Sequence, residues 1–132
     1  MNIHSKITGE LLHVVHRKKD FTEGRTDIVP ANEFIQCAAI SLYGGQTFKP
    51  HKHIEYQKVT TMAQESWCVV SGQIKAILYD LDDTILTEVI LNQGDISVTL
   101  KGGHNYECIT HSIVYEYKTG PYLGQQFDKT FI

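Results

Sequence analysis

The sequence lacks an apolar run of the roughly 18–20 residues that a membrane-spanning helix needs. Its N-terminal region also lacks the continuous apolar stretch and the small-residue cleavage site of a secretory signal. Basic residues are not in excess, because 12 Lys and Arg stand against 15 Asp and Glu and give a net charge of -3. This balance argues against a nucleic-acid or anionic-membrane surface. We therefore expect a cytoplasmic protein whose partners are small molecules and proteins.

Cysteine and proline are both scarce. The three cysteines, Cys37, Cys68 and Cys108, are odd in number and never spaced as CxxC, so they predict neither a disulfide framework nor a thiolate zinc site. We expect each to be a small apolar residue inside a strand. With 132 residues, 42% of them hydrophobic, the chain is long enough for one domain with a core that needs no covalent or metal staple.

Short runs rich in Val, Ile, Thr and Tyr alternate with Gly, Asp and Asn turn signals. Strands of this length and spacing are typical of an all-β sandwich or barrel and not of a βαβ protein. Residues 11–16 fit either a strand or a helical turn, and we find no repeat or domain boundary. The predicted strands are Phe34–Leu42, Glu65–Ser71, Gln73–Tyr79, Thr84–Leu91, Asp95–Leu100 and Ser112–Lys118.

His51 and His53 form a His-x-His pair. With seven histidines in the chain about 0.4 such pairs are expected by chance, so the pair alone is a weak signal. Pro50 disfavours a helix here, and in a strand residues two apart point to the same face. We expect the two imidazoles to lie side by side, as two ligands of one ion require.

Glu65 and His104 are two further candidate ligands. Glu65 shares a predicted strand face with Trp67 and Val69, where a carboxylate is costly to bury unless it is paired or holds a cation. The alternative is that Glu65 lies at the solvated end of its strand. His104 follows Gly102 and Gly103, which allow a tight turn that aims the next side chain inward. The alternative for His104 is a surface loop histidine.

These residues resemble the two motifs of the cupin family over residues 34–118. The spacing departs from the usual pattern in three ways. Eleven residues separate His53 from Glu65, Leu100 replaces a common proline, and His104 comes one residue early with no Asn at the usual interval. The first departure resembles an inserted loop, residues 54–64. The matching stretches are Gly45-x5-His51-x-His53, Glu65-x6-Gly72, Gly94-Asp95 and Gly102-Gly103-His104.

The resemblance is closer to an uncharacterised group of small, RmlC-like cupins often encoded near genes for surface-polysaccharide biosynthesis. It rests on the stretches 48–53, 79–83, 102–104 and 118–122. It implies an all-β fold, the cupin double-stranded β-helix or jelly-roll barrel, with an N-terminal extension, in one domain over residues 1–132. It also implies a homodimer and a metal site.

The implied metal ligands are His51, His53, Glu65 and His104. Three imidazoles and one carboxylate suit one divalent transition metal ion: Fe, Mn, Ni, Co or Zn. A six-coordinate ion with four protein ligands keeps two positions open for water or substrate. Because the imidazoles must be neutral, metal affinity is expected to fall below about pH 6.5.

Three functions remain open from the sequence. The first is a metal-dependent enzyme acting on a small polar metabolite such as a sugar or sugar-nucleotide. The second is a non-catalytic, metal-dependent ligand-binding or sensing protein. The third is a metal-free sugar isomerase or epimerase that works by acid–base chemistry. The aromatic residues that could line a pocket are Trp67, Tyr106, Tyr115 and Tyr117.

The homodimer is also expected from the N-terminal apolar residues Leu11, Leu12, Val14 and Val15, which need a surface to cover them. The isolated charges Arg25 and Lys118 are expected to face solvent. His4, His13, His16 and His111 have no partner spacing and are expected to be structural.

Overall fold

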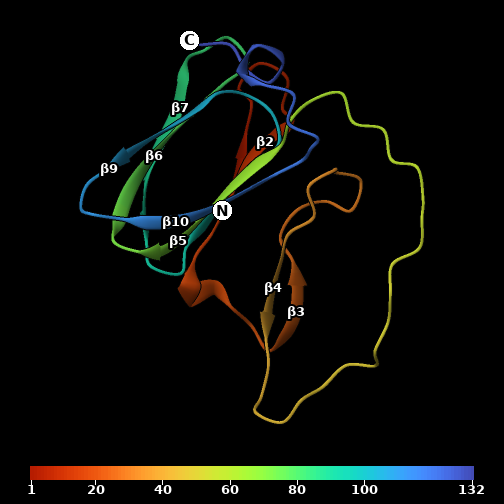
Figure 1. Ribbon diagram of the computed structural model, residues 1–132. Coiled ribbons are helices and arrows are strands. Elements are labelled where there is room, and N and C mark those ends of the chain that lie inside the picture. The colour runs from red at the N-terminus through yellow and green to blue at the C-terminus, as the bar shows by residue number, and fades with distance from the viewer.

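The computed structural model describes all residues, 1–132, and shows an all-β chain without α-helices, as predicted (Figure 1). Two 3-10 helices, η1 (Lys18–Asp20) and η2 (Gln125–Phe127), are the only helical turns. No helix combines the length and the apolar composition needed to cross a membrane. The strands are β1 (Asn2–His4), β2 (Leu11–His16), β3 (Gly24–Asp27), β4 (Ala38–Ser41), β5 (Glu65–Ser71), β6 (Gln73–Tyr79), β7 (Ile85–Asn92), β8 (Ile96–Thr99), β9 (His104–Cys108) and β10 (Ile113–Lys118).

Two antiparallel sheets enclose the main core. One has five strands in the order β1-β2-β8-β5-β10, and the other has three in the order β7-β6-β9. Val15 and Val69 from the first sheet pack against Ile74, Leu78 and Leu91 from the second. Because side chains alternate between faces, one apolar residue in two is enough to build this layer.

The outer face of the five-stranded sheet is covered in part by the segment that joins β3 to β4. Val29 of this segment packs with Val14, Val98 and Leu100 in a second apolar cluster. Leu12, Val14 and Val15 are therefore buried within one chain. Three of the four apolar residues on which the homodimer prediction rested therefore need no second subunit to cover them, and the fourth, Leu11, is half-buried.

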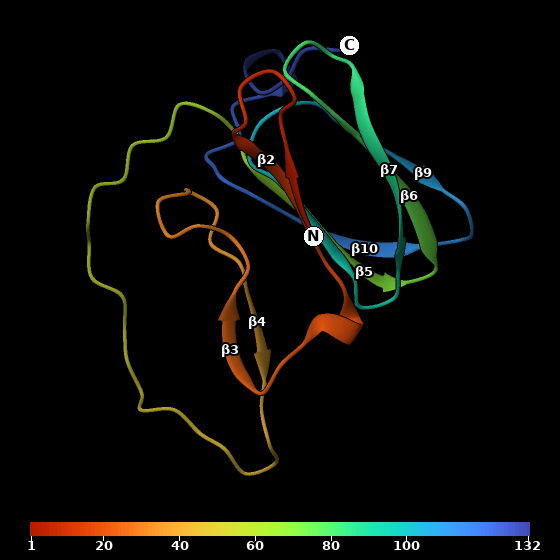
Figure 2. The ribbon, with the colours of Figure 1, turned by 180° about the vertical axis from the view of Figure 1, so that it is seen from behind.

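Residues 42–64 form a long connection without strands between β4 and β5. Figures 1 and 2 show this segment, which we call the arm, running away from the two sheets. Every residue from 42 to 59 is exposed to solvent, and Phe48, Ile54 and Tyr56 are among the most exposed apolar side chains. An arm of this length without structure is uncommon in a compact domain and usually has a function.

Most of the predicted strands agree with the structure to within about two residues at each end, an ordinary difference for strand boundaries. The predicted strand Phe34–Leu42 differs, because residues 34–37 precede β4, which begins at Ala38. Residues 11–16 are a strand, and β9 was not predicted. The two sheets do not form a closed barrel, since β1, β10, β7 and β9 each have an unpaired edge. The cupin topology therefore stays a prediction.

Candidate functional site

Glu65 and His104 meet at one end of the space between the two sheets. The Nε2 atom of His104 lies 3.1 Å from Oε1 of Glu65. The carboxylate is nearly buried, with 10% of its side chain exposed, while 25% of the imidazole is exposed. The pair therefore lies at the edge of the interior, where the imidazole is in part exposed to solvent, and we call this edge the mouth.

The register of β5 turns Glu65 inward. Glu65 pairs with Thr99 of β8 on one side and with Lys118 of β10 on the other. Val69, four residues further along β5, is 1% exposed and lies in the main core. Since residues two apart share a face, Glu65 and Trp67 point to the same interior.

The turn before β9 turns His104 inward. Gly102 has a φ of +80°, and a Cβ atom on it would lie 2.6 Å from the carbonyl oxygen of Tyr79, so only glycine fits this approach. The amide of Tyr79 donates to the carbonyl of Gly103 and ties the turn to β6. His104 then pairs with Leu78, a fully buried residue of the core face.

Two of the four predicted pocket aromatics line this mouth. The rings of Trp67 and Tyr106 stack with centroids 4.1 Å apart and planes 15° apart. The indole Nε1 of Trp67 donates to Oε1 of Glu65 at 2.8 Å, and the Tyr106 hydroxyl hydrogen-bonds to Ser97 at 2.8 Å. Trp67 thus anchors the carboxylate, and the two stacked rings form an apolar wall next to it.

The other two aromatics point away from the mouth. Tyr115 and Tyr117 are 61% and 59% exposed and lie on the outer face of β10. Glu116, between them, pairs with Trp67 and so shares the inner face. The structure brings Tyr115 and Tyr117 close to each other but not to Glu65 or His104.

The Glu65 carboxylate is held in its charged form. Burial on its own raises its pKa, but the interaction with His104 and the indole hydrogen bond of Trp67 outweigh burial. The pKa of Glu65 therefore lies below its ordinary value. Burial raises the pKa of Tyr106, so its phenol stays protonated.

His104 is not fully satisfied by its surroundings. Its Nδ1 atom is buried and has no hydrogen-bond partner. With the proton on Nε2, the imidazole donates to Glu65 and leaves only a lone pair uncompensated at Nδ1, which costs less than a buried unpaired N–H. The contact with Glu65 is thus the one strong interaction that fixes the ring.

Lys118 is a component of this mouth that the sequence did not reveal. It was expected to face solvent, but only 20% of its side chain is exposed. Its ammonium group lies 3.3 Å from Asp128 and 4.3 Å from the centre of the Tyr122 ring. Burial on its own lowers its pKa, but the nearby carboxylates outweigh it and raise the pKa, so the amine is charged. Its alternation with Val114 and Glu116 was the signal available in the sequence.

His51 and His53 lie apart from this pair, on the arm. Their rings are next to each other, with centroids 5.6 Å apart, as the His-x-His spacing predicts. Both residues are exposed. The structure brings no three of the His, Cys, Asp and Glu residues into a group that could hold a metal ion. The four predicted ligands are therefore placed as two separate pairs.

Comparisons with known proteins add no relative. No family model, no curated protein and no solved structure matches this chain.

Proposed function

We propose that this chain is a metal-binding protein of the cupin type that acts, as a cytoplasmic homodimer, on a small polar metabolite such as a sugar or sugar-nucleotide of polysaccharide biosynthesis. The observation that carries the proposal is the contact between Glu65 and His104. Their oxygen and nitrogen atoms approach to 3.1 Å at a partly open mouth. An oxygen and a nitrogen atom at this distance share a cation between them, which is either a proton or a metal ion.

The donor chemistry fits a divalent transition metal ion. Glu65 and His104 supply one oxygen and one nitrogen, and His51 and His53 supply two more nitrogens that are already adjacent. The arm must bring the second pair to the first. The eleven residues between His53 and Glu65 can span about 40 Å when extended, so the length of the chain permits this approach.

A bound ion of this kind polarises a carbonyl or activates water. The residues of the chain around it have separate roles. Trp67 holds the Glu65 carboxylate in place, and the Trp67–Tyr106 pair excludes water from one side of the mouth. Lys118 places a positive charge on the same inner face, where it can bind an anionic or hydroxyl group of a substrate.

The contact of His104 with Glu65 also favours one alternative, a metal-free sugar isomerase or epimerase. A carboxylate that orients an imidazole is a common acid–base arrangement. Chelator treatment separates the two candidates. Solvent deuterium entering a keto-sugar nucleotide with chelator-treated protein supports the metal-free enzyme, while exchange only after metal is restored supports the metal enzyme. Metal and sugar-nucleotide binding without turnover identifies a sensing or binding protein.

Metal content tests the proposal directly. We expect about one divalent ion per chain in the wild type, and a large loss in the H51A/H53A variant and in Glu65→Gln, because each removes part of the ligand set. Elemental analysis after expression in metal-supplemented medium provides the measurement. The matched control is H4A/H111A, which removes two exposed histidines outside the site and should retain the ion. Equal metal content in wild type and H51A/H53A would refute the proposal.

A further inference from the structure

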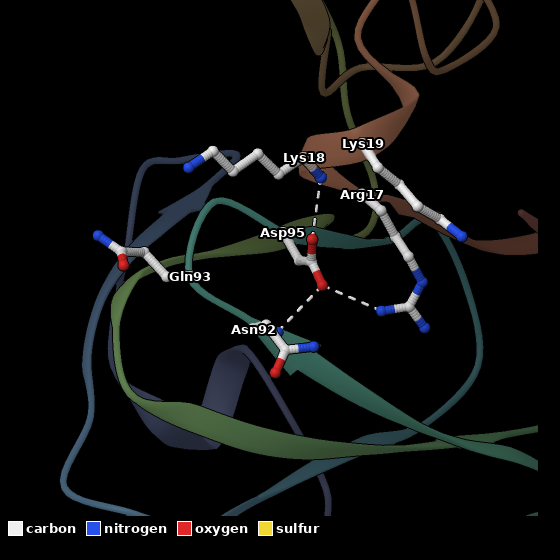
Figure 3. Close-up of a pocket in the computed structure, with 6 residues that line it drawn as sticks. All are labelled: Arg17, Lys18, Lys19, Asn92, Gln93 and Asp95. Atoms are coloured by element: carbon white, nitrogen blue, oxygen red, sulfur yellow. Dashed lines mark hydrogen bonds and ion pairs between the residues drawn. The ribbon is translucent and has the colours of Figure 1, made fainter.

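A basic cleft lies at the end of the sandwich opposite Glu65 and His104. β5 and β8 pair Glu65 with Thr99 at one end and Cys68 with Ile96 at the other, and Asp95 comes directly before Ile96. The cleft is shallow and wide open to solvent, with a volume of about 670 Å³ and no hydrophobic lining residue (Figure 3). It is lined by Arg17, Lys18, Lys19, Asn92, Gln93 and Asp95.

Asp95 fixes the floor of this cleft. Asp95 is buried, with 4% of the residue exposed. Its carboxylate accepts hydrogen bonds from Arg17 Nη1 at 3.0 Å, from the backbone amide of Lys18 at 2.9 Å and from the backbone amide of Asn92 at 3.0 Å. Arg17 also donates to the carbonyl of Ile90 at 2.8 Å. The chain before η1 and the β7–β8 turn are thus held together, and their polar groups are preorganised.

The positive charge of the cleft exceeds its negative charge. Asp95 compensates Arg17, but neither Lys18 nor Lys19 has an ion pair or a side-chain hydrogen bond in the structure. Figure 3 shows Lys19 running alongside Arg17, with Lys18 extending toward the side of Gln93. Asp20, the acidic neighbour in the chain, accepts from the amide of Arg17 and is not part of the lining.

Two side-chain amides with free N–H groups lie beside these positive charges. Asn92 uses its side-chain oxygen to accept from Gln73 at 2.8 Å, which leaves its NH₂ group available. The Gln93 side chain has no partner within the chain and stands at the rim of the cleft. Cations combined with amide donors, and no hydrophobic residue in the lining, match a compact, multiply charged oxyanion better than an apolar ligand.

We propose that this cleft binds the phosphate group of a small soluble metabolite. Lys18 and Lys19 supply the charge, the side-chain amides of Asn92 and Gln93 donate hydrogen bonds, and the Asp95–Arg17 pair holds the framework. The site is independent of the proposed metal site, because the two share no residue. Because the net charge of the whole chain is negative, the excess of positive charge in the cleft is a local feature of the surface.

Titration with pyrophosphate, followed by amide resonances in ¹⁵N NMR spectra at constant ionic strength, tests the proposal. We expect the resonances of Asn92 and Gln93 to shift and saturate in the wild type. In K18Q/K19Q the affinity should fall by about tenfold or more, which is the effect of losing roughly 1.4 kcal/mol of binding free energy. The matched control is K52Q/K58Q, which removes two exposed charges from the arm and should bind like the wild type.

Two outcomes overturn the proposal: shifts that do not saturate in the wild type, and equal affinity of wild type and K18Q/K19Q. Vesicles containing phosphatidic acid distinguish the source of the phosphate. Pyrophosphate binding without sedimentation on these vesicles supports a soluble metabolite. Sedimentation that depends on Lys18 and Lys19 overturns that assignment in favour of a lipid headgroup.

Discussion

At the scale of single residues, His13 is a titratable side chain enclosed in the fold. It is 0% exposed, and its ring contacts the Thr99 hydroxyl at 3.1 Å and the Tyr79 carbonyl at 2.9 Å. Burial is the main cause that lowers its pKa below 6.5, and the hydrogen bond to Tyr79 opposes the shift in part. The folded state therefore prefers the neutral ring.

This preference predicts a stability that depends on pH. Well above pH 6.5 the ring is neutral in both states and adds no dependence. Below that value the unfolded chain binds a proton that the folded chain does not, so the free energy of unfolding should fall, by at most about 1.4 kcal/mol per pH unit. Urea unfolding of metal-free protein between pH 7 and about 5 measures the slope. His13→Gln should flatten it, whereas exposed His111→Gln should leave it unchanged; equal slopes would contradict this account.

How well a residue's role could be predicted depended on its local pattern. Strand alternation placed Glu65 on the face of Trp67 and Val69, and two glycines marked the turn that aims His104 inward. Lys118 was not foreseen, because its partner Asp128 comes from the C-terminal segment and no local spacing links the two. Contacts between distant segments depend on the fold as a whole, which local patterns do not specify.

At the scale of elements, the arm differs from every strand of the sandwich. Its residues from 42 to 59 are exposed, and its backbone hydrogen bonds to the rest of the chain are confined to Gln64, which pairs with Thr119 at the end of β10. The long spacing between His53 and Glu65 revealed an insertion, but periodicity could not show where that insertion goes. The rings of His51 and His53 are neighbours, as the His-x-His spacing predicted. The strand on which that prediction was based is absent, because the two residues lie between β4 and β5.

Shortening the arm tests whether it contributes to the folded body. In the test variant, a Gly-Ser linker of half the length replaces residues 46–60. We expect its free energy of unfolding without metal to lie within about 1 kcal/mol of the wild-type value, because no buried contact is removed and the entropy of loop closure changes little. Metal binding should be lost with His51 and His53. Urea unfolding and elemental analysis give the two measurements, and H51A/H53A, which keeps the arm, is the control. A loss of several kcal/mol would show that the arm packs on the sheets.

At the scale of the whole molecule, the all-β class followed from composition and turn spacing, whereas the closure of the sheets did not. Closure depends on which strand edges pair, and such pairing joins residues far apart in the chain. The structure leaves β1 and β10 as the unpaired edges of the larger sheet, and Tyr115 and Tyr117 are exposed on the outer face of β10. Unpaired edges are sites where sheets of two copies can join.

The homodimer is therefore expected to form along β10, where two tyrosines are exposed, and not through β2, whose residues Leu12, Val14 and Val15 are buried within the chain. Antiparallel pairing of two β10 edges satisfies backbone groups on both copies and keeps the contact self-complementary, as two-fold symmetry requires. Sedimentation equilibrium at micromolar concentration should give a dimer for the wild type. Y115K/Y117K should give a monomer, since charges on an edge strand oppose pairing. The control Y43K/Y56K places the same charges on the exposed arm and should remain dimeric, while a monomeric wild type would exclude the dimer.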